Sequence, residues 1–319
     1  MEYSAKSFLS LVVVLLSALG SLPVGAAGTA KGQLQIEVAN DAPFQTDRDY
    51  TGGLHLAWRP ANSPFTLHLG QDIYTPEDLT TTTPVDGEHP YGGWTYLGVN
   101  YLYQISANWR ADVTLDIGST GPRSGARVMQ EWIHRATGST VPKGWQSQMH
   151  NEWGFMPELK LDYKLPLSAF QKGGLVYRVV PYLRWRSGNI IRDHGVGVRL
   201  MLGSQLPVFS NVATQPDGDF YWFFRVGLEY TAVARNILLE GNSKVRNGVK
   251  QYSYGVIPEK ALAVANLGVF WGFDSYEAGV DIQYNSKAYA SQGHINSSFL
   301  IGGTPSGNFV MSVIFKKFF

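Results

Sequence analysis

The chain has 319 residues, with 26 Lys and Arg against 25 Asp and Glu, 7 His and no Cys. The formal net charge of +1 excludes the basic excess with which proteins bind the phosphates of nucleic acid. The absence of Cys excludes disulfides, thiolate zinc sites and a cysteine nucleophile. Charged residues make up only 16% of the chain and aromatic residues 13%. This composition is typical of a β-rich protein with an apolar, aromatic-rimmed surface, with a secreted β-sandwich as the alternative.

The N-terminus has the pattern of a targeting segment. Lys6 is followed by an apolar run over 8–19, and the small residues Gly25-Ala26-Ala27 follow a helix-breaking stretch. The run is shorter than the ~20 residues that a membrane-spanning helix needs. We therefore predict a secretory signal peptide over 1–27, whose removal leaves one domain over 28–319. A retained N-terminal anchor is the alternative.

Apolar and polar residues alternate along the rest of the chain, as they do at Leu34, Ile36 and Val38. Such segments suit tilted transmembrane strands, which need ~9–11 residues to cross the hydrocarbon. Only a closed barrel lets strands cross lipid with every backbone group paired. We therefore predict an all-β fold, a transmembrane antiparallel β-barrel of about twelve strands in the bacterial outer membrane. The segments are 33–38, 54–59, 65–70, 93–104, 107–118, 150–164, 174–187, 192–204, 219–231, 261–273, 275–289 and 307–319.

Connection lengths set the polarity of this barrel, because bacterial barrels have short periplasmic turns and long external loops. If the first strand runs outward, most long connections lie outside the cell, including 41–50 and 119–149. The opposite polarity would place nearly all of them in the periplasm.

The external segment from Pro122 to Gly138 departs from the β pattern. Val128 and Trp132 are four residues apart, as are Met129 and Ile133, so they form an apolar stripe at helical spacing. We predict a helix in this loop, with Gln130 and His134 on its polar face. The stripe is expected to pack on the barrel wall and flank lipid chains, or simply to dock the helix.

Polar residues gather at the external end of the predicted barrel. Asn40, Asp41 and Thr51 offer hard oxygen ligands of the kind that Ca²⁺ prefers, although Asn-Asp is also a common turn at a strand end. The external loop also carries Gln130, Glu131 and His134, and a lone histidine on a helix is commonly a surface residue. The chain contains no G-x-S-x-G elbow in a strand–turn–helix context. A His/Ser pair at 294–297 could suit an outer-membrane phospholipase, but it lacks the His-x-Ser-Asn-Gly order of that family.

Four ordered blocks between residues 38 and 152 resemble the lipid A 3′-O-deacylase family of outer-membrane barrels. The carboxy-terminal half resembles it only in its barrel character. The first block is VAND at 38–41 with TDRDYTGG at 46–53, the second QDIYTP at 71–76, the third HPYGGWTYLG at 89–98, and the fourth QEWIHR at 130–135 with PKGWQSQ at 142–148 and Asn151-Glu152.

The resemblance implies a calcium-dependent enzyme that removes the 3′-linked acyloxyacyl group of lipid A. It implies that His134 is the general base, that Gln130 is a further site residue, and that Asn40, Asp41 and Thr51 lie on the calcium side. The substrate is then lipopolysaccharide in the outer membrane, and we expect a monomer without nucleic-acid partners. Alternatives are a passive pore or scaffold, and an outer-membrane phospholipase.

The chain also departs from the family pattern. Ala39 stands where an acidic residue is frequent and Gly52 where a longer polar side chain is frequent. Threonines occupy 80–83, where some relatives carry Lys and Arg. Phosphate recognition then falls to other groups, and the basic residues with positional support are Arg123, Arg127, Arg135 and Lys143, for which a solvated helix face is the alternative.

Overall fold

The structure is a computed structural model of the chain. It describes residues 31–44, 48–166, 171–172, 174–207, 209, 220–242, 245–246, 249–250, 255–292 and 306–319. The predicted signal peptide over 1–27 and the His/Ser pair at 294–297 lie outside these residues.

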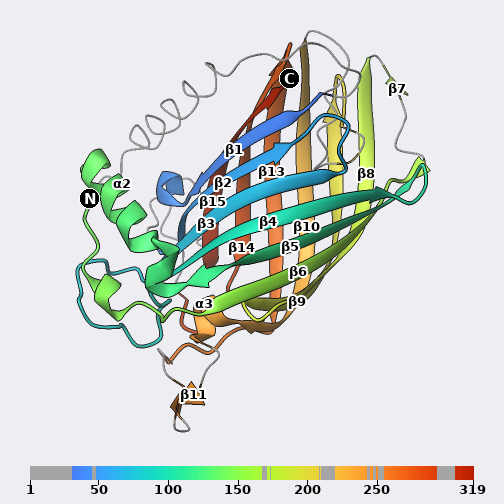
Figure 1. The fold of residues 1–319 in the computed structure, drawn as a ribbon. Helices are drawn as coiled ribbons and strands as arrows, with labels where there is room; N and C mark the ends of the chain where they lie inside the picture. The colour runs from blue at the N-terminus through green and yellow to red at the C-terminus, as the bar shows by residue number, and fades with distance from the viewer. Residues whose placement is uncertain are drawn as a thin grey trace.

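Twelve antiparallel strands form a closed barrel (Figure 1). Each strand pairs with its neighbours along the chain, and the ring closes where β1 pairs with β15 and where β6 pairs with β8. The strands are β1 (Gln33–Asn40), β2 (Asp49–Arg59), β3 (Phe65–Thr75), β4 (Gly92–Gln104), β5 (Trp109–Thr120), β6 (Trp153–Tyr163), β8 (Leu175–Ser187), β9 (Ile191–Gly203), β10 (Phe220–Asn236), β13 (Ala261–Phe273), β14 (Tyr276–Ser286) and β15 (Gly307–Phe318).

All twelve predicted segments are confirmed as strands. β2 begins at Asp49, five residues before the predicted segment, and β10 continues five residues further, to Asn236. A bulge interrupts each of these extensions, between Tyr50 and Gly52 and between Val233 and Arg235. Because a bulge breaks the period-two alternation, the sequence pattern faded there before the strand ended. Three strands of two residues lie outside the ring: β7 (Gln171–Lys172), β11 (Val245–Arg246) and β12 (Val249–Lys250).

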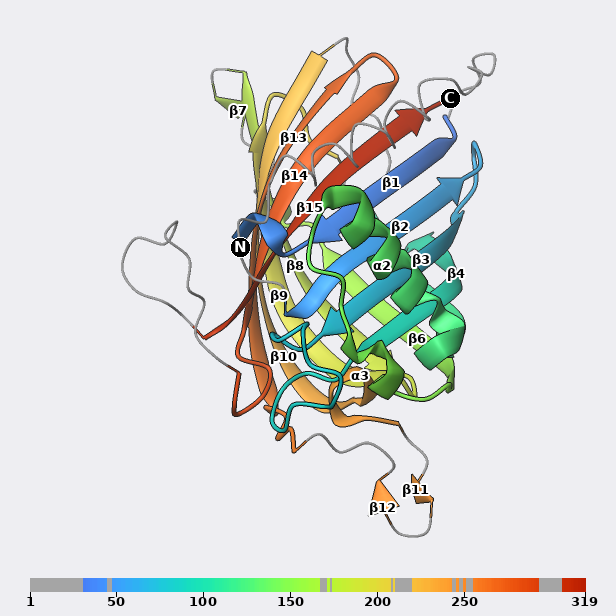
Figure 2. The same cartoon turned by 90° about the vertical axis from the view of Figure 1, so that its left-hand side faces the viewer.

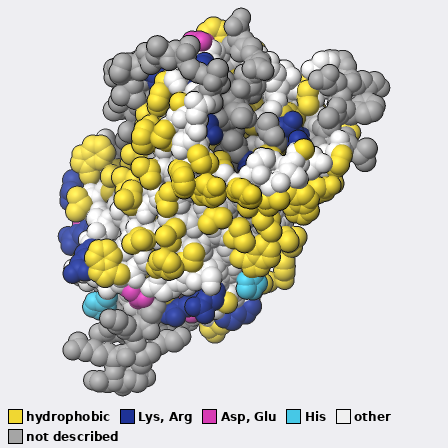
Figure 3. Space-filling view, turned by 45° about the vertical axis from the view of Figure 1, so that its right-hand side comes forward, with side chains coloured by type: hydrophobic (Ala, Val, Ile, Leu, Met, Phe, Trp, Pro, Cys, Tyr) yellow, Lys and Arg dark blue, Asp and Glu magenta, His cyan; other side chains and the backbone are white. Residues whose placement is uncertain are grey.

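The side chains alternate between a lipid face and the lumen. Large apolar residues are exposed on the outer face of most strands, and the space-filling view shows them as a band across the wall (Figure 3). Polar groups face inward and pair with one another, such as Arg110 with Asp162 at 2.7 Å and Arg184 with Asp193 at 2.8 Å. None of the helices in the described part of the chain is long and apolar enough to span a membrane.

The helical elements lie in the connections at the external end. The predicted helix in the loop after β5 is confirmed as the 3₁₀ turn η2 (Gly121–Ser124) followed by α2 (Ala126–Thr137), with Gly138 in the left-handed conformation at the C-cap. The remaining elements are η1 (Ala42–Phe44), η3 (Gly144–Ser147) and α3 (Ile237–Glu240).

In the connection after β9, residues 204–207 and Phe209 fold into the periplasmic end of the lumen. Arg178 donates hydrogen bonds to the carbonyls of Leu206 and Pro207, and the Arg110 guanidinium lies 4.4 Å from the centroid of the Phe209 ring. Leu206 and Phe209 place apolar side chains in this end of the barrel interior. Around Leu206 and Phe209 pack Val180, Met201, Tyr221, Phe223, Phe270 and Ile314.

Because this apolar plug around Leu206 and Phe209 occupies the periplasmic end of the lumen, we expect the purified protein to show no steady ion conductance in a planar lipid bilayer. The double substitution Leu206→Ala and Phe209→Ala removes much of the apolar plug and is expected to produce channel openings. Steady conductance of the unsubstituted protein would instead support the passive-pore alternative.

Candidate active site on the outer wall

Asn40 joins the end of β1 to the start of β2. Its side-chain Nδ2 donates to the backbone oxygen of Thr51 at 2.7 Å, and its Oδ1 accepts from the backbone N–H of Ala42 at 2.6 Å. Thr51 lies at the β2 bulge, and its hydroxyl donates to the carbonyl of Ile73 on β3 at 3.2 Å. The structure therefore brings Asn40 and Thr51 into direct contact.

Asp41 follows Asn40 and is fully buried. Its Oδ2 accepts a hydrogen bond from the backbone N–H of Arg48 at 3.0 Å. Burial of a carboxylate is costly unless positive charge or hydrogen bonds compensate it. A buried carboxylate next to the amide oxygen of Asn40 is a donor set of hard oxygens, the chemistry that Ca²⁺ prefers.

No group of three or more His, Asp or Glu residues that could hold a metal occurs in the described part of the chain. A calcium ion at this end of β1 would therefore need amide, hydroxyl or backbone oxygens beside the Asp41 carboxylate, which are ordinary ligands for Ca²⁺. Asn40 and Thr51 supply such oxygens, so the residues present fit the ion.

The polar network under the first turn of α2 fixes the helix on the wall. Gln71 on β3 donates to the carbonyl of Ser124 at 2.7 Å, and Thr95 on β4 donates to the same oxygen at 2.7 Å. Gly93 on β4 lies directly beneath, where a Cβ would collide with the side chains of Ala126 and Ser124. Figure 2 shows α2 lying against the outside of the barrel, in front of the strands at this end.

Gln130 and His134 lie on the wall-facing side of α2, one turn apart, and each is only 4% exposed. The Oε1 of Gln130 accepts a hydrogen bond from the indole N–H of Trp145 at 2.8 Å. Trp145 itself packs against Ile73 on β3 and Ala126 on α2. This hydrogen bond links α2 to η3, the 3₁₀ turn that follows it in the same loop, and fixes the side chain of Gln130.

His134 has a defined tautomer. Its Nδ1 lies 2.6 Å from the carbonyl oxygen of Thr140, and because a carbonyl only accepts, Nδ1 carries the proton. The lone pair then belongs to Nε2. Burial lowers the pKa of His134 below its ordinary value, against the opposing effect of the Thr140 carbonyl. The ring is therefore neutral near pH 7, the form that accepts a proton.

The apolar stripe of α2 does not pack on the wall as a unit, so the expectation of a packed stripe was wrong, whereas its contact with lipid chains stays a prediction. Met129 packs against the cluster around Trp145, whereas Val128 is 71% and Trp132 56% exposed. Gln130 and His134 are buried, whereas Val128 and Trp132 are exposed beside the charged side chains of Arg127 and Arg135. The exposed surface of the helix is therefore mixed apolar and charged, a composition suited to a membrane interface.

Two further residues belong to this region but were not assigned a role from the sequence. Thr75 ends β3 fully buried, and among the described residues its hydroxyl has no hydrogen-bond partner. Trp145 orients Gln130. Both lie inside the blocks that resemble the deacylase family, which was the only signal that could have identified them.

The four basic candidates for phosphate recognition differ in their surroundings. Arg127 and Arg135 each pair with Glu131 at 2.8 Å, and these hydrogen bonds, that of Arg127 foremost, lower the pKa of Glu131. Arg123 lies 5.8 Å from the centroid of a Trp153 ring, and Lys143 is exposed. Glu131 partly neutralises the positive charge of α2.

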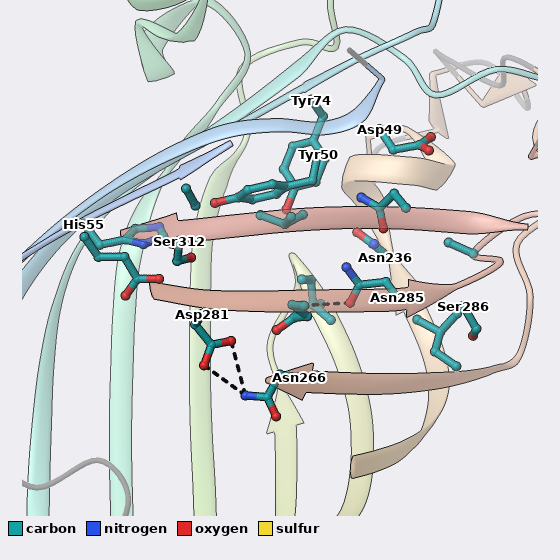
Figure 4. Close-up of a pocket in the computed structure, with 18 of the residues that line it drawn as sticks. Asp49, Tyr50, His55, Tyr74, Asn236, Asn266, Asp281, Asn285, Ser286 and Ser312 are labelled. Atoms are coloured by element: carbon teal, nitrogen blue, oxygen red, sulfur yellow. Dashed lines mark hydrogen bonds between the residues drawn. The ribbon is translucent and has the colours of Figure 1, made fainter. Parts of the chain in front are cut away.

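The lumen contains a separate polar cavity of about 660 Å³. Figure 4 shows Asp49, His55 and Asn266 among the side chains that line it. His55 Nε2 lies 2.9 Å from Asp72 Oδ1, which also accepts from the Tyr50 hydroxyl. The barrel wall separates this cavity from α2.

The chain matches one protein family over most of its length. The family model described as "Outer membrane protein LpxR" matches residues 9–301. Among solved structures, LpxR from Salmonella typhimurium is similar with a TM-score of 0.75 and 20% sequence identity, over 90% of this chain and 100% of that chain. At that identity the likeness shows the shared fold alone.

Two other matches carry no argument about this chain. The β domain of the Bordetella autotransporter BrkA has a TM-score of only 0.42 at 12% identity, over 91% of this chain and 100% of that chain. A glutamate decarboxylase from Solanum lycopersicum is 31% identical over 144 residues, which are 40% of this chain. The chain spans only 28% of the length of that curated relative.

The seating of α2 can be tested at Gly93. We expect Gly93→Val to displace α2, because the added side chain occupies the space of Ala126 and Ser124, while the barrel strands keep their pairing. Limited proteolysis should then cut the 121–149 loop faster, with the heat-modifiable electrophoretic mobility of the barrel unchanged. The matched control is Gly52→Val, whose Cβ has only ordinary contacts of 3.6 Å or more. Equal proteolysis of the two variants would contradict the described seating.

Proposed function

The chain belongs to the LpxR family of outer membrane proteins, and we propose that it is a calcium-dependent lipid A deacylase that hydrolyses the 3′-linked acyloxyacyl ester. The observation that carries the proposal is the placement of His134. A neutral, oriented histidine is buried under a helix whose exposed surface carries the apolar side chains of Val128 and Trp132 beside two arginines.

The location suits a lipid substrate. A closed barrel in the outer membrane offers the leaflet only its outer wall, and α2 lies on that wall. Trp132 and Val128 present apolar surface to acyl chains, while the polar face of α2 and the polar ends of β1 and β2 form the opposite boundary. An ester bond, which joins apolar chains to a polar sugar, fits such a boundary.

The proposed reaction is direct hydrolysis. The Nε2 of His134 accepts a proton from a water molecule, whose oxygen attacks the ester carbonyl carbon. The tetrahedral intermediate then expels the sugar oxygen, which takes the proton from His134. The Thr140 carbonyl holds the imidazolium in place through Nδ1 while the proton resides on Nε2.

Asn40, Asp41 and Thr51 are the residues that would hold the calcium ion. When bound, Ca²⁺ would polarise the ester carbonyl and stabilise negative charge on its oxygen. Asn40 has a second task, because it ties β1 to the β2 bulge. Gln130, fixed by Trp145, is placed to position substrate or water one helical turn from His134.

His134→Ala should lower kcat/KM at least ~10²-fold, the usual contribution of a general base, with the barrel still folded. Because burial lowers the pKa of His134, the unsubstituted enzyme should lose activity only as the pH falls below the ordinary histidine value of about 6.5. The measurement is mass spectrometry of lipid A from expressing cells, together with a pH profile of the purified enzyme.

His150→Ala is the matched control, since His150 is an exposed histidine of the same loop. A wild-type rate for His134→Ala would refute the mechanism. Intact lipid A with release of fatty acid from glycerophospholipids would instead favour the phospholipase alternative.

Asp41→Asn should weaken calcium binding and leave the backbone hydrogen bond from Arg48 in place, because the amide oxygen also accepts. We expect the calcium concentration for half-maximal activity to rise by about tenfold or more, given the charge removed from a buried position. Titration with a luminescent lanthanide reports the same change without turnover. Asp78→Asn, an exposed carboxylate of the neighbouring loop, should change neither value, and unchanged metal affinity in Asp41→Asn would exclude this site.

A further inference from the structure

The wall opposite α2 carries an unneutralised pair of arginines. α2 contacts β3 and β4, whereas the pair lies on β9 and β10. Around the barrel, four strands lie between β3 and β9 in one direction and six in the other. This surface is therefore separate from the candidate active site.

The strand register arranges the outward side chains of β8, β9 and β10 in rows. The row nearest the external loops holds Ser187, Arg192 and Arg235, and the next row holds Trp185 and His194 with a small alanine. Four apolar rows follow towards the periplasmic end. They are Leu183, Val196 and Tyr230; Pro181, Val198 and Leu228; Val179, Leu200 and Val226; and Tyr177, Leu202 and Phe224.

These rows place the arginines relative to the membrane. Same-face residues along a strand are ~7 Å apart, so four apolar rows span about 20 Å along the strand. With a strand tilt of ~35–45° this is about 15 Å of the ~25 Å apolar band of an outer-membrane barrel. The arginine row lies two rows beyond, at the level of lipid headgroups. In Figure 3, Lys and Arg side chains likewise gather along the lower edge of the hydrophobic band, where the external loops lie.

Arg192 and Arg235 point outward. Their chain neighbours Ile191 and Asn236 line the lumen cavity, so alternation turns the two arginines to the opposite face. They are also direct cross-strand partners, an arrangement in which like charges repel.

Nothing within the described residues relieves this repulsion. Neither arginine forms an ion pair with a carboxylate there, and the buried Nε of Arg235 has no hydrogen-bond partner among them. The nearest acidic side chains of the two strands, Asp193 and Glu229, face the lumen and pair with Arg184. The outward pair therefore has donors and charge for an anion.

An apolar groove of about 490 Å³ lies on the same wall, on the periplasmic side of the arginines. The small side chains of Ala263 and Ala265 on β13 leave a depression beside the larger residues of β9 and β10. Its lining is predominantly apolar, and its outward residues are Val196, Val198, Leu228, Tyr230, Ala263, Ala265 and Tyr284.

We propose that this wall binds a lipopolysaccharide molecule that is not a substrate. Arg192 and Arg235 hold a phosphate of its lipid A, and one acyl chain occupies the apolar groove on the periplasmic side of this pair. Adjacent guanidinium groups match the oxygens of a phosphate and form charge-assisted hydrogen bonds with them. The proposal depends on the location of the barrel in the outer membrane and not on deacylation.

The test is site-specific cross-linking to lipid A carrying both phosphates. A benzophenone-bearing residue in place of Tyr230 lies within the groove and should form an adduct with the mass of lipid A. In Arg192→Gln/Arg235→Gln the yield should fall about tenfold, as expected for the loss of hydrogen bonds between charged groups. Lipid A without phosphates should give a similarly low yield.

The matched control is Arg127→Gln/Arg135→Gln, which removes the same charge from the opposite wall and should leave the yield unchanged. Folding is checked by heat-modifiable mobility, and if the double variant does not fold, each single variant is measured. Equal yields with and without the arginine pair would overturn the proposal. Equal competition by phosphatidylglycerol would also overturn it, because the site would then not select lipid A.

Discussion

The closure of the hydrogen-bonded ring between β1 and β15 and between β6 and β8 is the constraint on which the rest of the structure depends. In hydrocarbon an unpaired backbone group has no water to bond, so the strands must form a ring without edges. Closure sets the register of every strand, and the register decides which residues meet lipid. It also brings the end of β1, the start of β2 and the loop carrying α2 to one rim. A site assembled from these distant segments is a consequence of the barrel.

The orientation of α2 follows from its solvent. In water an amphipathic helix buries its apolar side, but here Val128 and Trp132 are exposed and Gln130 and His134 are buried, which suits the proposed contact with acyl chains. Gln71 and Thr95 bind the backbone of the 3₁₀ turn η2 that precedes α2, and Trp145 binds Gln130. Val128 and Trp132 can therefore remain exposed without a penalty from water. The same arrangement shields His134 from solvent and lowers its pKa, so the inversion of the helix and the chemistry of its histidine have one cause.

Much of this fold could be predicted from the sequence, because the alternation of lipid-facing and lumen-facing residues is written directly into each strand. The bulges at Thr51 and before Arg235 could not, since an inserted residue breaks that alternation without leaving a pattern of its own. The positions of Gln130 and His134 on a shared helix face followed from their spacing. Which face met the barrel did not, because periodicity is the same whether an apolar stripe faces protein or lipid. The contact of Trp145 with Gln130 and the pairing of Arg192 with Arg235 depend on tertiary register, which no local pattern contains.

The arginines of α2 and the arginines of β9 and β10 differ in how their charge is neutralised. On α2, Glu131 lies between Arg127 and Arg135 and bonds both, so the helix carries part of its own neutralisation and needs no external anion for stability. On β9 and β10, the carboxylates Asp193 and Glu229 are turned into the lumen by alternation and bonded to Arg184. The outward arginines cannot reach these carboxylates, because the alternation of side chains along β9 and β10 places both acidic residues on the lumen face of the wall. Within the described residues their charge is left without an acidic partner, and in an outer leaflet the anions that we propose to compensate it are the phosphates of lipopolysaccharide.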